Sequence, residues 1–415
     1  MSPLVKRILL IIGLLIVAAL IGFAIYYVGF ARRVAPPEPA TTDNGSGTVF
    51  VPPTGGRRTT TPAGTGTGGT TPGGAAGPGG VTNQNAGGIY YQPTPVKQIT
   101  SSTPAFLSVS NGGTTRFHDL TSGKFYRIMP DGSVKTLSDQ IFYNVQKVTW
   151  AQDSNKAVIE YPDNFKTVYN FDTQKQTTLP SHWQDFSFSA DGTQIAAKSI
   201  GLSPDNRWLV TVNDDGSGTR LIEPLGDNAD EVTVSWSPSR QTVAFSQTGD
   251  PAGYDRRQIL LIGLNGENFK PVTVEGLDFM PQWSPTGKRL LYSVDSARSD
   301  FKPELWVTDA YGDSIDNNRQ ALKINTWADK CTFGSDDNTL FCAIPRDLPS
   351  GAGLSPGLAS GSVDDVYKID LKTGARSAVA LDNKDYRITS MDYDKTGNRL
   401  IFTDLTKSGV FQAGL

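Results

Sequence analysis

Residue types that usually carry enzyme chemistry are scarce in this sequence. Its 415 residues include two histidines, His118 and His182, and two cysteines, Cys331 and Cys342. Metal centres and histidine-dependent active sites draw several groups from these residue types. No phosphate-binding loop or zinc-ligand spacing occurs either. We therefore expect no metal, no cofactor and no catalytic triad.

One segment has the spacing of a nucleophile elbow, Gly353-Leu-Ser355-Pro-Gly357. That motif needs a strand before the serine and a helix after it. Here the serine lies among Gly, Pro and Ser residues and is followed by proline, so we expect a loop without catalytic function. Acidic clusters at 213–217 and 382–385 could bind a cation, but Asp, Asn and Gly are also the residues that turns require. Calcium loops have a stricter spacing, so we interpret both clusters as turns.

The two cysteines are placed to face each other. Cys331 lies two residues before Phe333 and Cys342 lies nine after it, on either side of a polar turn at 335–338. Opposed Cβ atoms in an antiparallel pair are about 4.5–5.5 Å apart, near the upper end of what a disulfide needs. Two buried thiols would also suit these apolar positions. We favour the disulfide, which persists in oxidising compartments.

The elements that position these residues come from a repeated unit. Its clearest copy starts at Phe279 with an apolar strand, turns after Trp283 at Ser-Pro-Thr-Gly, and continues with strands at 289–294 and 304–309. Copies recur with the aromatic residue that ends the first strand 38 to 60 residues from the next, a period typical of propeller blades. These aromatic residues are Trp150, Phe188, Trp236, Trp283, Phe333 and Tyr393.

The units close into a ring. Their second strands are apolar on both faces, as strands between neighbouring sheets are. An earlier copy at 105–138 makes seven units, and the last unit lacks a fourth strand. Residues 95–101 have the pattern of 133–138 and could supply it, which would remove the open sheet edges. We predict an all-β, seven-bladed β-propeller closed by an N-terminal strand, although a turn-like segment at 202–206 also permits six or eight blades.

The turn Trp283-Ser-Pro-Thr-Gly287, followed by Lys-Arg-Leu-Leu-Tyr-Ser, resembles the repeat of the periplasmic propeller protein of the Tol-Pal system, the TolB type. It is also similar to the propeller repeat of prolyl-oligopeptidase and dipeptidyl-peptidase enzymes. The resemblance covers roughly residues 95–415 and is clearest around Trp236 and Trp283. It implies a propeller, commonly extracytoplasmic, that serves protein interaction or gates a substrate.

The first part of the chain differs in composition from the propeller. Residues 8–30 carry no charge and could cross a bilayer core of about 30 Å, so we expect a single membrane anchor within 1–33. A cleaved signal peptide is the alternative, but its apolar region would be about 7–15 residues. Residues 34–94 are rich in Gly, Pro and Thr and should form a disordered linker. Residues 95–415 form the propeller domain.

Charge and loop length suggest what the propeller binds. The net charge of −3 argues against a nucleic-acid partner. Basic residues flank both ends of the anchor and give no orientation, so the expected disulfide places the propeller outside the cytoplasm and the N-terminus inside. Three consecutive blades have long connections between their second and third strands, at 246–257, 295–303 and 345–364. These carry residue types that are enriched at interfaces, namely Tyr254, Arg256, Arg257, Arg298, Phe301, Arg346 and Leu348.

We therefore expect a non-enzymatic scaffold that binds a protein or another cell-envelope partner. Two alternatives stay open. One is a propeller hydrolase or lyase, which would show carboxylates with raised pKa values at the mouth of the central channel. The other is a sensor of glycans or small ligands, which would show exposed aromatic side chains in the central funnel.

Overall fold

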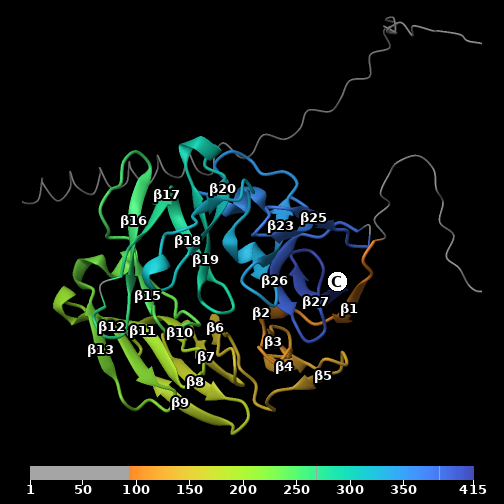
Figure 1. Cartoon of the computed structure of the whole chain (residues 1–415). Helices are drawn as coiled ribbons and strands as arrows, with labels where there is room; N and C mark the ends of the chain where they lie inside the picture. The colour runs from red at the N-terminus through yellow and green to blue at the C-terminus, as the bar shows by residue number, and fades with distance from the viewer. Residues whose placement is uncertain (1–92, 268, 383) are drawn as a thin grey trace, which may run out of the picture. The chain divides into compact units, whose positions relative to one another are not determined.

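The computed structural model describes residues 93–415 except 268 and 383, and within them the chain forms seven four-stranded antiparallel sheets (Figure 1). The expected anchor and nearly all of the expected linker lie outside the described residues. In the part of the chain that is described, no helix is long and apolar enough to span a membrane. The predicted all-β class and the count of seven blades are confirmed.

Each blade runs from its first strand, near the centre of the ring, to its fourth strand at the perimeter (Figure 1). Blades 1 to 6 follow chain order. Blade 1 consists of β2 (Pro104–Val109), β3 (Thr115–Asp119), β4 (Lys124–Ile128) and β5 (Val134–Thr136), blade 2 of β6 (Lys147–Trp150), β7 (Lys156–Glu160), β8 (Lys166–Asn170) and β9 (Lys175–Leu179), and blade 3 of β10 (Trp183–Phe188), β11 (Gln194–Ile200), β12 (Arg207–Asn213) and β13 (Arg220–Pro224). Blade 4 consists of β14 (Val232–Val234), β15 (Ala244–Ser246), β16 (Arg256–Ile262) and β17 (Val272–Glu275), blade 5 of β18 (Leu277–Trp283), β19 (Arg289–Asp295), β20 (Pro303–Asp309) and β21 (Gln320–Ala321), and blade 6 of β22 (Cys331–Phe333), β23 (Thr339–Pro345), β24 (Asp364–Asp370) and β25 (Arg376–Val379).

Blade 7 joins the two ends of the described chain. It consists of β26 (Ile388–Asp394), β27 (Arg399–Asp404), β28 (Val410–Gly414) and the N-terminal strand β1 (Val96–Thr100). Strand β1 pairs antiparallel with β28, with Val96 opposite Ala413. The predicted closure by an N-terminal strand is therefore confirmed. The turn-like segment at 202–206 belongs to the connection between β11 and β12 and contains a single turn of 3-10 helix, so it adds no blade.

Two of the recurrent tryptophans tie neighbouring blades together. Trp150 of blade 2 donates its indole N–H to the carbonyl oxygen of Phe106 in blade 1, at 2.7 Å. Trp283 of blade 5 donates in the same way to Ser235, which follows the first strand of blade 4, at 3.1 Å from its hydroxyl. A large apolar ring with one polar handle suits a position between two sheets.

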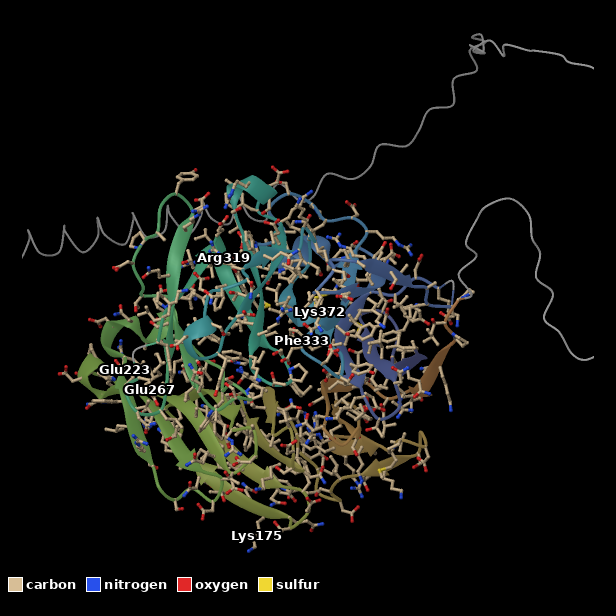
Figure 2. The ribbon with its side chains drawn as sticks, in the orientation of Figure 1. Lys175, Glu223, Glu267, Arg319, Phe333 and Lys372 are labelled. Carbon is tan, nitrogen blue, oxygen red and sulfur yellow. A yellow bond between two sulfur atoms is a disulfide. The ribbon has the colours of Figure 1, made fainter. Side chains whose placement is uncertain are left out.

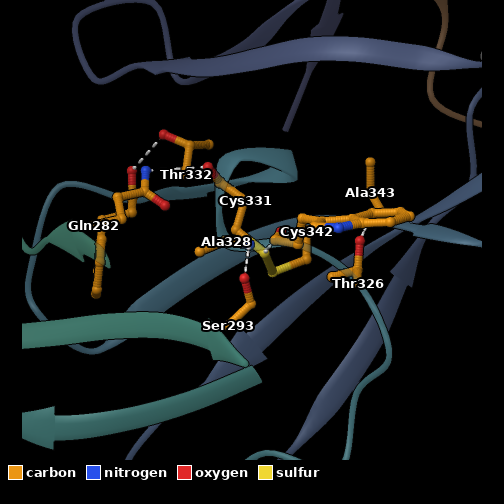
Figure 3. Close-up of a disulfide and its surroundings, with 10 residues drawn as sticks. Gln282, Ser293, Thr326, Ala328, Cys331, Thr332, Cys342 and Ala343 are labelled. Carbon is orange, nitrogen blue, oxygen red and sulfur yellow. Dashed lines mark hydrogen bonds between the residues drawn. A yellow bond between two sulfur atoms is a disulfide. The ribbon is translucent and has the colours of Figure 1, made fainter. Parts of the chain in front are cut away.

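Cys331 and Cys342 lie directly opposite each other in the β22–β23 pair and form a disulfide, with their Cα atoms 4.0 Å apart. Both residues are buried in the core between blades 5 and 6. Figure 3 shows the bond next to Ala328, whose backbone N–H donates to the Ser293 hydroxyl of blade 5 at 3.2 Å. The disulfide thus joins the two innermost strands of blade 6 at a packed blade boundary.

The first strands of several blades are interrupted by a β-bulge. The pairing register shifts after Ala105, Gln184 and Leu277. The residue that follows each of them has a left-handed backbone, with φ of 54° at Phe106, 54° at Asp185 and 50° at Asp278. Asp is one of the few residues with a side chain that tolerates this conformation. In blades 3 and 5 the bulge therefore places a carboxylate at the inner strand, where the strand begins.

Candidate binding face

One side of the propeller carries two sets of connections. Connections from second to third strands leave on the side where first strands begin, because first and second strands are antiparallel. Connections from each fourth strand to the next first strand therefore end on the same side. We call this side the loop face.

The loop face holds most of the exposed apolar side chains of the described residues. The described chain has fourteen exposed large hydrophobic residues in total, and nine of them lie in or next to connections of the loop face. The nine are Leu120, Ile141, Tyr143, Leu202, Tyr254, Leu277, Leu354, Leu358 and Leu405. The other five, on outer strands or the opposite face, are Val134, Leu221, Leu260, Tyr311 and Leu415. Scattered exposed leucines are ordinary on a protein surface, but their concentration on one face marks that face for contact.

The long connections support one another. The connection at 346–363 lies against the one at 296–302, because the backbone N–H of Gly351 donates to Asp300 O at 2.8 Å and that of Gly353 donates to Phe301 O at 2.7 Å. A Cβ atom at Gly353 would lie 2.5 Å from the Cβ of Asp295. Only glycine permits this approach, so the connection closes directly over the end of β19.

The structure brings together four of the seven residues expected at an interface. Tyr254, Arg256, Arg257 and Phe301 line one cavity of about 400 Å³ between blades 4 and 5, which we call the Tyr254 pocket. Arg298 lines a neighbouring cavity of about 540 Å³. Further round the face, Arg346 lines a separate cavity of about 510 Å³. Leu348 is half-buried within the 346–363 connection.

Most of the expected interface arginines are engaged within the chain. The buried carboxylate of Glu275 receives Arg298 at 2.7 Å and Arg256 at 3.2 Å. Arg319, which is labelled in Figure 2, lies 3.7 Å from the same carboxylate. The ion pair raises the pKa of Arg298. Arg346 is held in the same manner by two aspartates, Asp365 at 2.8 Å and Asp385 at 3.0 Å. These cations brace the long connections, and a charged partner would have to compete for them.

A further cavity of the loop face contains acidic residues that the sequence did not lead us to expect. It measures about 440 Å³ and lies under the 346–363 connection, and we call it the funnel pocket. Its lining residues come from blades 4 to 6 and the connections above them, and they are Thr233, Gln247, Asp278, Phe279, Met280, Pro281, Ser293, Val294, Asp295, Pro303, Trp327, Gly353, Leu354 and Pro356. Trp327, Met280 and Pro356 also line an adjoining cavity of about 250 Å³ that reaches Asp329 and Arg387.

Two carboxyl groups meet at this pocket. Asp295 is buried at the end of β19, and burial, followed by the neighbouring Asp278 carboxylate, raises its pKa to about 6. Arg257 acts in the opposite direction and lowers it. Burial also raises the pKa of Asp329, which lines the adjoining cavity. One feature of the sequence could have indicated Asp278 and Asp295. Asp295 directly follows the apolar residues of β19, and Asp278 directly precedes Phe279.

The catalytic and metal patterns considered from the sequence find no support in the geometry. Ser355 lies within the 346–363 connection and is followed by a short 3-10 helix (Pro356–Ala359), with no strand before it. Asp215 uses one carboxylate oxygen to accept from the N–H and hydroxyl of Ser217, which is a turn function. Among residues 93–415, apart from the two omitted positions, no group of three or more His, Cys, Asp or Glu side chains is placed to hold a metal ion.

No protein-family model matches the sequence, and a comparison with curated proteins finds no match. Solved structures do match. Oligogalacturonate lyase from Vibrio parahaemolyticus is 11% identical, with a TM-score of 0.55, over 77% of this chain and 93% of that chain. The β-propeller domain of Cps50 (Swd1) from Myceliophteria thermophila is 9% identical, with a TM-score of 0.53, over 77% of this chain and 98% of that chain.

TolB from Acinetobacter baumannii is also among the similar structures, at 13% identity and a TM-score of 0.43 over 76% of this chain and 67% of that chain. The two matches with the higher TM-scores given above are a lyase and a propeller domain of another kind. Likeness at such low identity shows architecture and leaves activity open. On the sheet topology and these similarities together, the described part of the chain is a seven-bladed β-propeller.

Proposed function

We propose that this protein is a membrane-tethered, extracytoplasmic β-propeller whose loop face binds a protein partner in the cell envelope. The observation that carries the proposal is the gathering of nine exposed large hydrophobic residues on that face. Tyrosine and tryptophan are among the residues that carry most of the binding energy of protein interfaces, and apolar surface that a partner covers adds to it. Tyr254 is the most prominent of those beside a cavity, with 88% of its surface exposed.

The construction of the loop face supports the same function. The long connections are joined to one another by backbone hydrogen bonds and to the blades by ion pairs of Glu275. A surface that is already ordered loses little conformational entropy when a partner binds. The face therefore combines apolar contact area with a rigid frame.

The uncharged segment at 8–30 and the disulfide support the placement outside the cytoplasm. The segment is long enough for one membrane crossing. A disulfide between Cys331 and Cys342 persists where the environment is oxidising. Together they support the proposal of a domain that is anchored at the membrane and exposed on its outer side.

The test is cross-linking of the full-length protein in intact cells with a reagent that does not cross membranes. Wild-type protein is expected to capture a protein partner, and a variant with Tyr254→Ser, Leu358→Ser and Leu405→Ser is expected to capture at least tenfold less. The matched control carries Leu221→Ser and Tyr311→Ser, which lie away from the loop face. Equal capture by all three proteins would reject the loop face as the docking surface, and capture only after lysis would reject the extracytoplasmic placement.

A second candidate is a hydrolase or lyase that works at the funnel pocket. The raised pKa of Asp295 beside Asp278 favours it, since perturbed carboxyl groups in a cavity are typical of acid–base catalysts. Incubation with oligogalacturonate, the substrate named for one similar structure, and with other envelope oligosaccharides separates the two candidates. Product that disappears in Asp278→Asn would favour the enzyme, and no product with any of them would favour the binding module.

A further inference from the structure

The charged residues that line the funnel pocket are all negative. Two of its lining residues are charged, and both are aspartates, Asp278 and Asp295. The remaining lining is apolar or neutral and includes two aromatic rings, those of Phe279 and Trp327. Its volume of about 440 Å³ falls within the range of roughly 300–1,000 Å³ that is common for ligand sites.

One of the two carboxyl groups lacks a partner. Asp295 is 2% exposed, and its Oδ2 atom has no hydrogen-bond partner within residues 93–415 as described. Buried polar atoms without a partner are uncommon in folded proteins and call for an explanation. The charged groups that act on Asp295 are Asp278 from β18 and Arg257 from β16. No hydrogen bond or ion pair with Arg257 is formed in the described chain, and a hydrogen bond to Asp278 exists only while one of the two acids holds a proton, so ionised Asp295 has no donor for Oδ2.

The other carboxyl group is presented to solvent. Asp278 is exposed, and the bulge in β18 turns its backbone into the left-handed region, with φ of 50°. It is thus the carboxylate that a ligand can reach, while Asp295 adds negative charge from behind. A positive group at this point would relieve the repulsion between the two acids, whereas an anion would increase it.

The aromatic and apolar walls narrow the ligand class further. Trp327 and Phe279 line the pocket, and the electron-rich face of an aromatic ring attracts a cation. Met280, Leu354 and Pro356 offer apolar surface for a hydrocarbon stem. A basic side chain combines a hydrocarbon stem with a terminal charge, so it matches both parts of the pocket.

The geometry points to a site for a lysine or arginine side chain of the partner protein, inserted into the funnel pocket between Asp278 and Trp327. This inference rests on the proposed docking function and names the chemistry that the partner must present. The roof formed by 346–363 would hold the inserted side chain, since Gly353, Leu354 and Pro356 line the same cavity.

The test is calorimetric titration of the full-length protein with N-acetyl-arginine amide. The matched ligand is N-acetyl-citrulline amide, which has nearly the same shape but no charge. At pH 7 the arginine compound is expected to bind at least tenfold more tightly than the citrulline compound, and Asp278→Asn should remove this difference. The matched control is Asp313→Asn, an exposed aspartate in the connection between β20 and β21 on the opposite face, which should bind like the wild type. Asparagine tolerates the left-handed backbone, so the variant at 278 should keep its fold.

The pH dependence supplies an independent readout. Because the pKa of Asp295 is about 6, lowering the pH from 7 to 5 protonates it and should weaken arginine binding by about tenfold. Equal affinity for the two compounds, or arginine binding that survives Asp278→Asn, would overturn the inference. If the cross-linking described above still captures a partner in that case, the docking function stands and only the basic-side-chain site is lost. If the compounds bind as expected but no partner is captured, the docking function fails by itself.

Discussion

Blades 3 and 5 contain the same backbone feature with opposite electrostatic surroundings. In each, a bulge in the first strand puts an aspartate in the left-handed conformation, Asp185 in β10 and Asp278 in β18. The residue before the bulge faces the second strand. Gln184 lies opposite Lys198, and Leu277 lies opposite Asp295. The corresponding position on the second strand is therefore a lysine in one blade and an aspartate in the other.

The consequences for the two bulge aspartates differ. Lys198 is buried, lies 2.8 Å from the carboxylate of Asp185, and also donates to the carbonyl oxygens of Ala229 and Val232. The acid of blade 3 is thus neutralised within the fold. The acid of blade 5 has a second carboxyl group behind it and a cavity in front of it. One residue on the second strand thus decides whether the bulge aspartate has a cation or a second carboxyl group beside it.

The largest change in the free energy of unfolding is expected from Lys198→Met. The change keeps most of the apolar stem but leaves Asp185, Ala229 O and Val232 O without their donor. Breaking a buried charged contact of this kind costs about 3 kcal/mol. Urea unfolding at pH 7 measures the loss. A variant as stable as the wild type would show that Lys198 contributes little and that the contrast between the blades is only geometric.

A smaller change in stability, and in the opposite direction, is expected from Asp295→Asn. The folded protein raises the pKa of Asp295 from 3.8 to about 6, so it holds the proton more tightly than the unfolded chain does. Stability is therefore lost as the pH rises from about 4 to 6, and the ionised carboxyl at pH 7.5 costs on the order of 2 kcal/mol. The asparagine variant should be more stable than the wild type by this amount at pH 7.5 and about equal at pH 4. Identical pH profiles of unfolding for the two proteins would contradict the raised pKa of Asp295 in the folded protein.

The smallest effect is expected from the two bulge aspartates themselves. Asp185→Asn leaves the buried ammonium of Lys198 without its counter-charge and should destabilise the protein by about 1 kcal/mol. Asp278→Asn removes a repulsion and should be neutral or slightly stabilising. Asparagine accepts the left-handed backbone at both sites, so each variant serves as the control for the other in thermal unfolding. A similar loss in both would mean that the carboxylates matter for the bulge and not for their charge surroundings.

The architecture could be predicted from the sequence because each blade repeats a local requirement. Residues such as Trp150 and Trp283 recur where a ring must bridge two sheets, and strands such as β19 are apolar on both faces because sheets cover both sides. The closure by β1 was readable from the missing fourth strand of the last unit. Each of these signals depends on a short stretch of chain with a regular period.

The candidate site was only partly predictable. Long connections pointed to Tyr254 and Phe301, which do share a cavity. The pairing of Arg298 and Arg256 with Glu275 could not be foreseen, because Glu275 ends a strand in blade 4 and nothing in the sequence says what faces it. Asp278 and Asp295 were missed for the same reason, since a bulge and a register shift bring them together. Side-chain pairing across strands depends on register, which a single residue can change.

The closure of blade 7 also sets the order in which the molecule can be built. Gln98 donates from its side chain to the carbonyl oxygen of Ser408, 310 positions later in the chain. Strand β1 must therefore wait without a strand partner until β28 has been synthesised. Pairings over such sequence distances form slowly, and an unpaired edge invites association with other chains while it waits. A chain that stops before the last blade would leave six blades and a loose N-terminal strand.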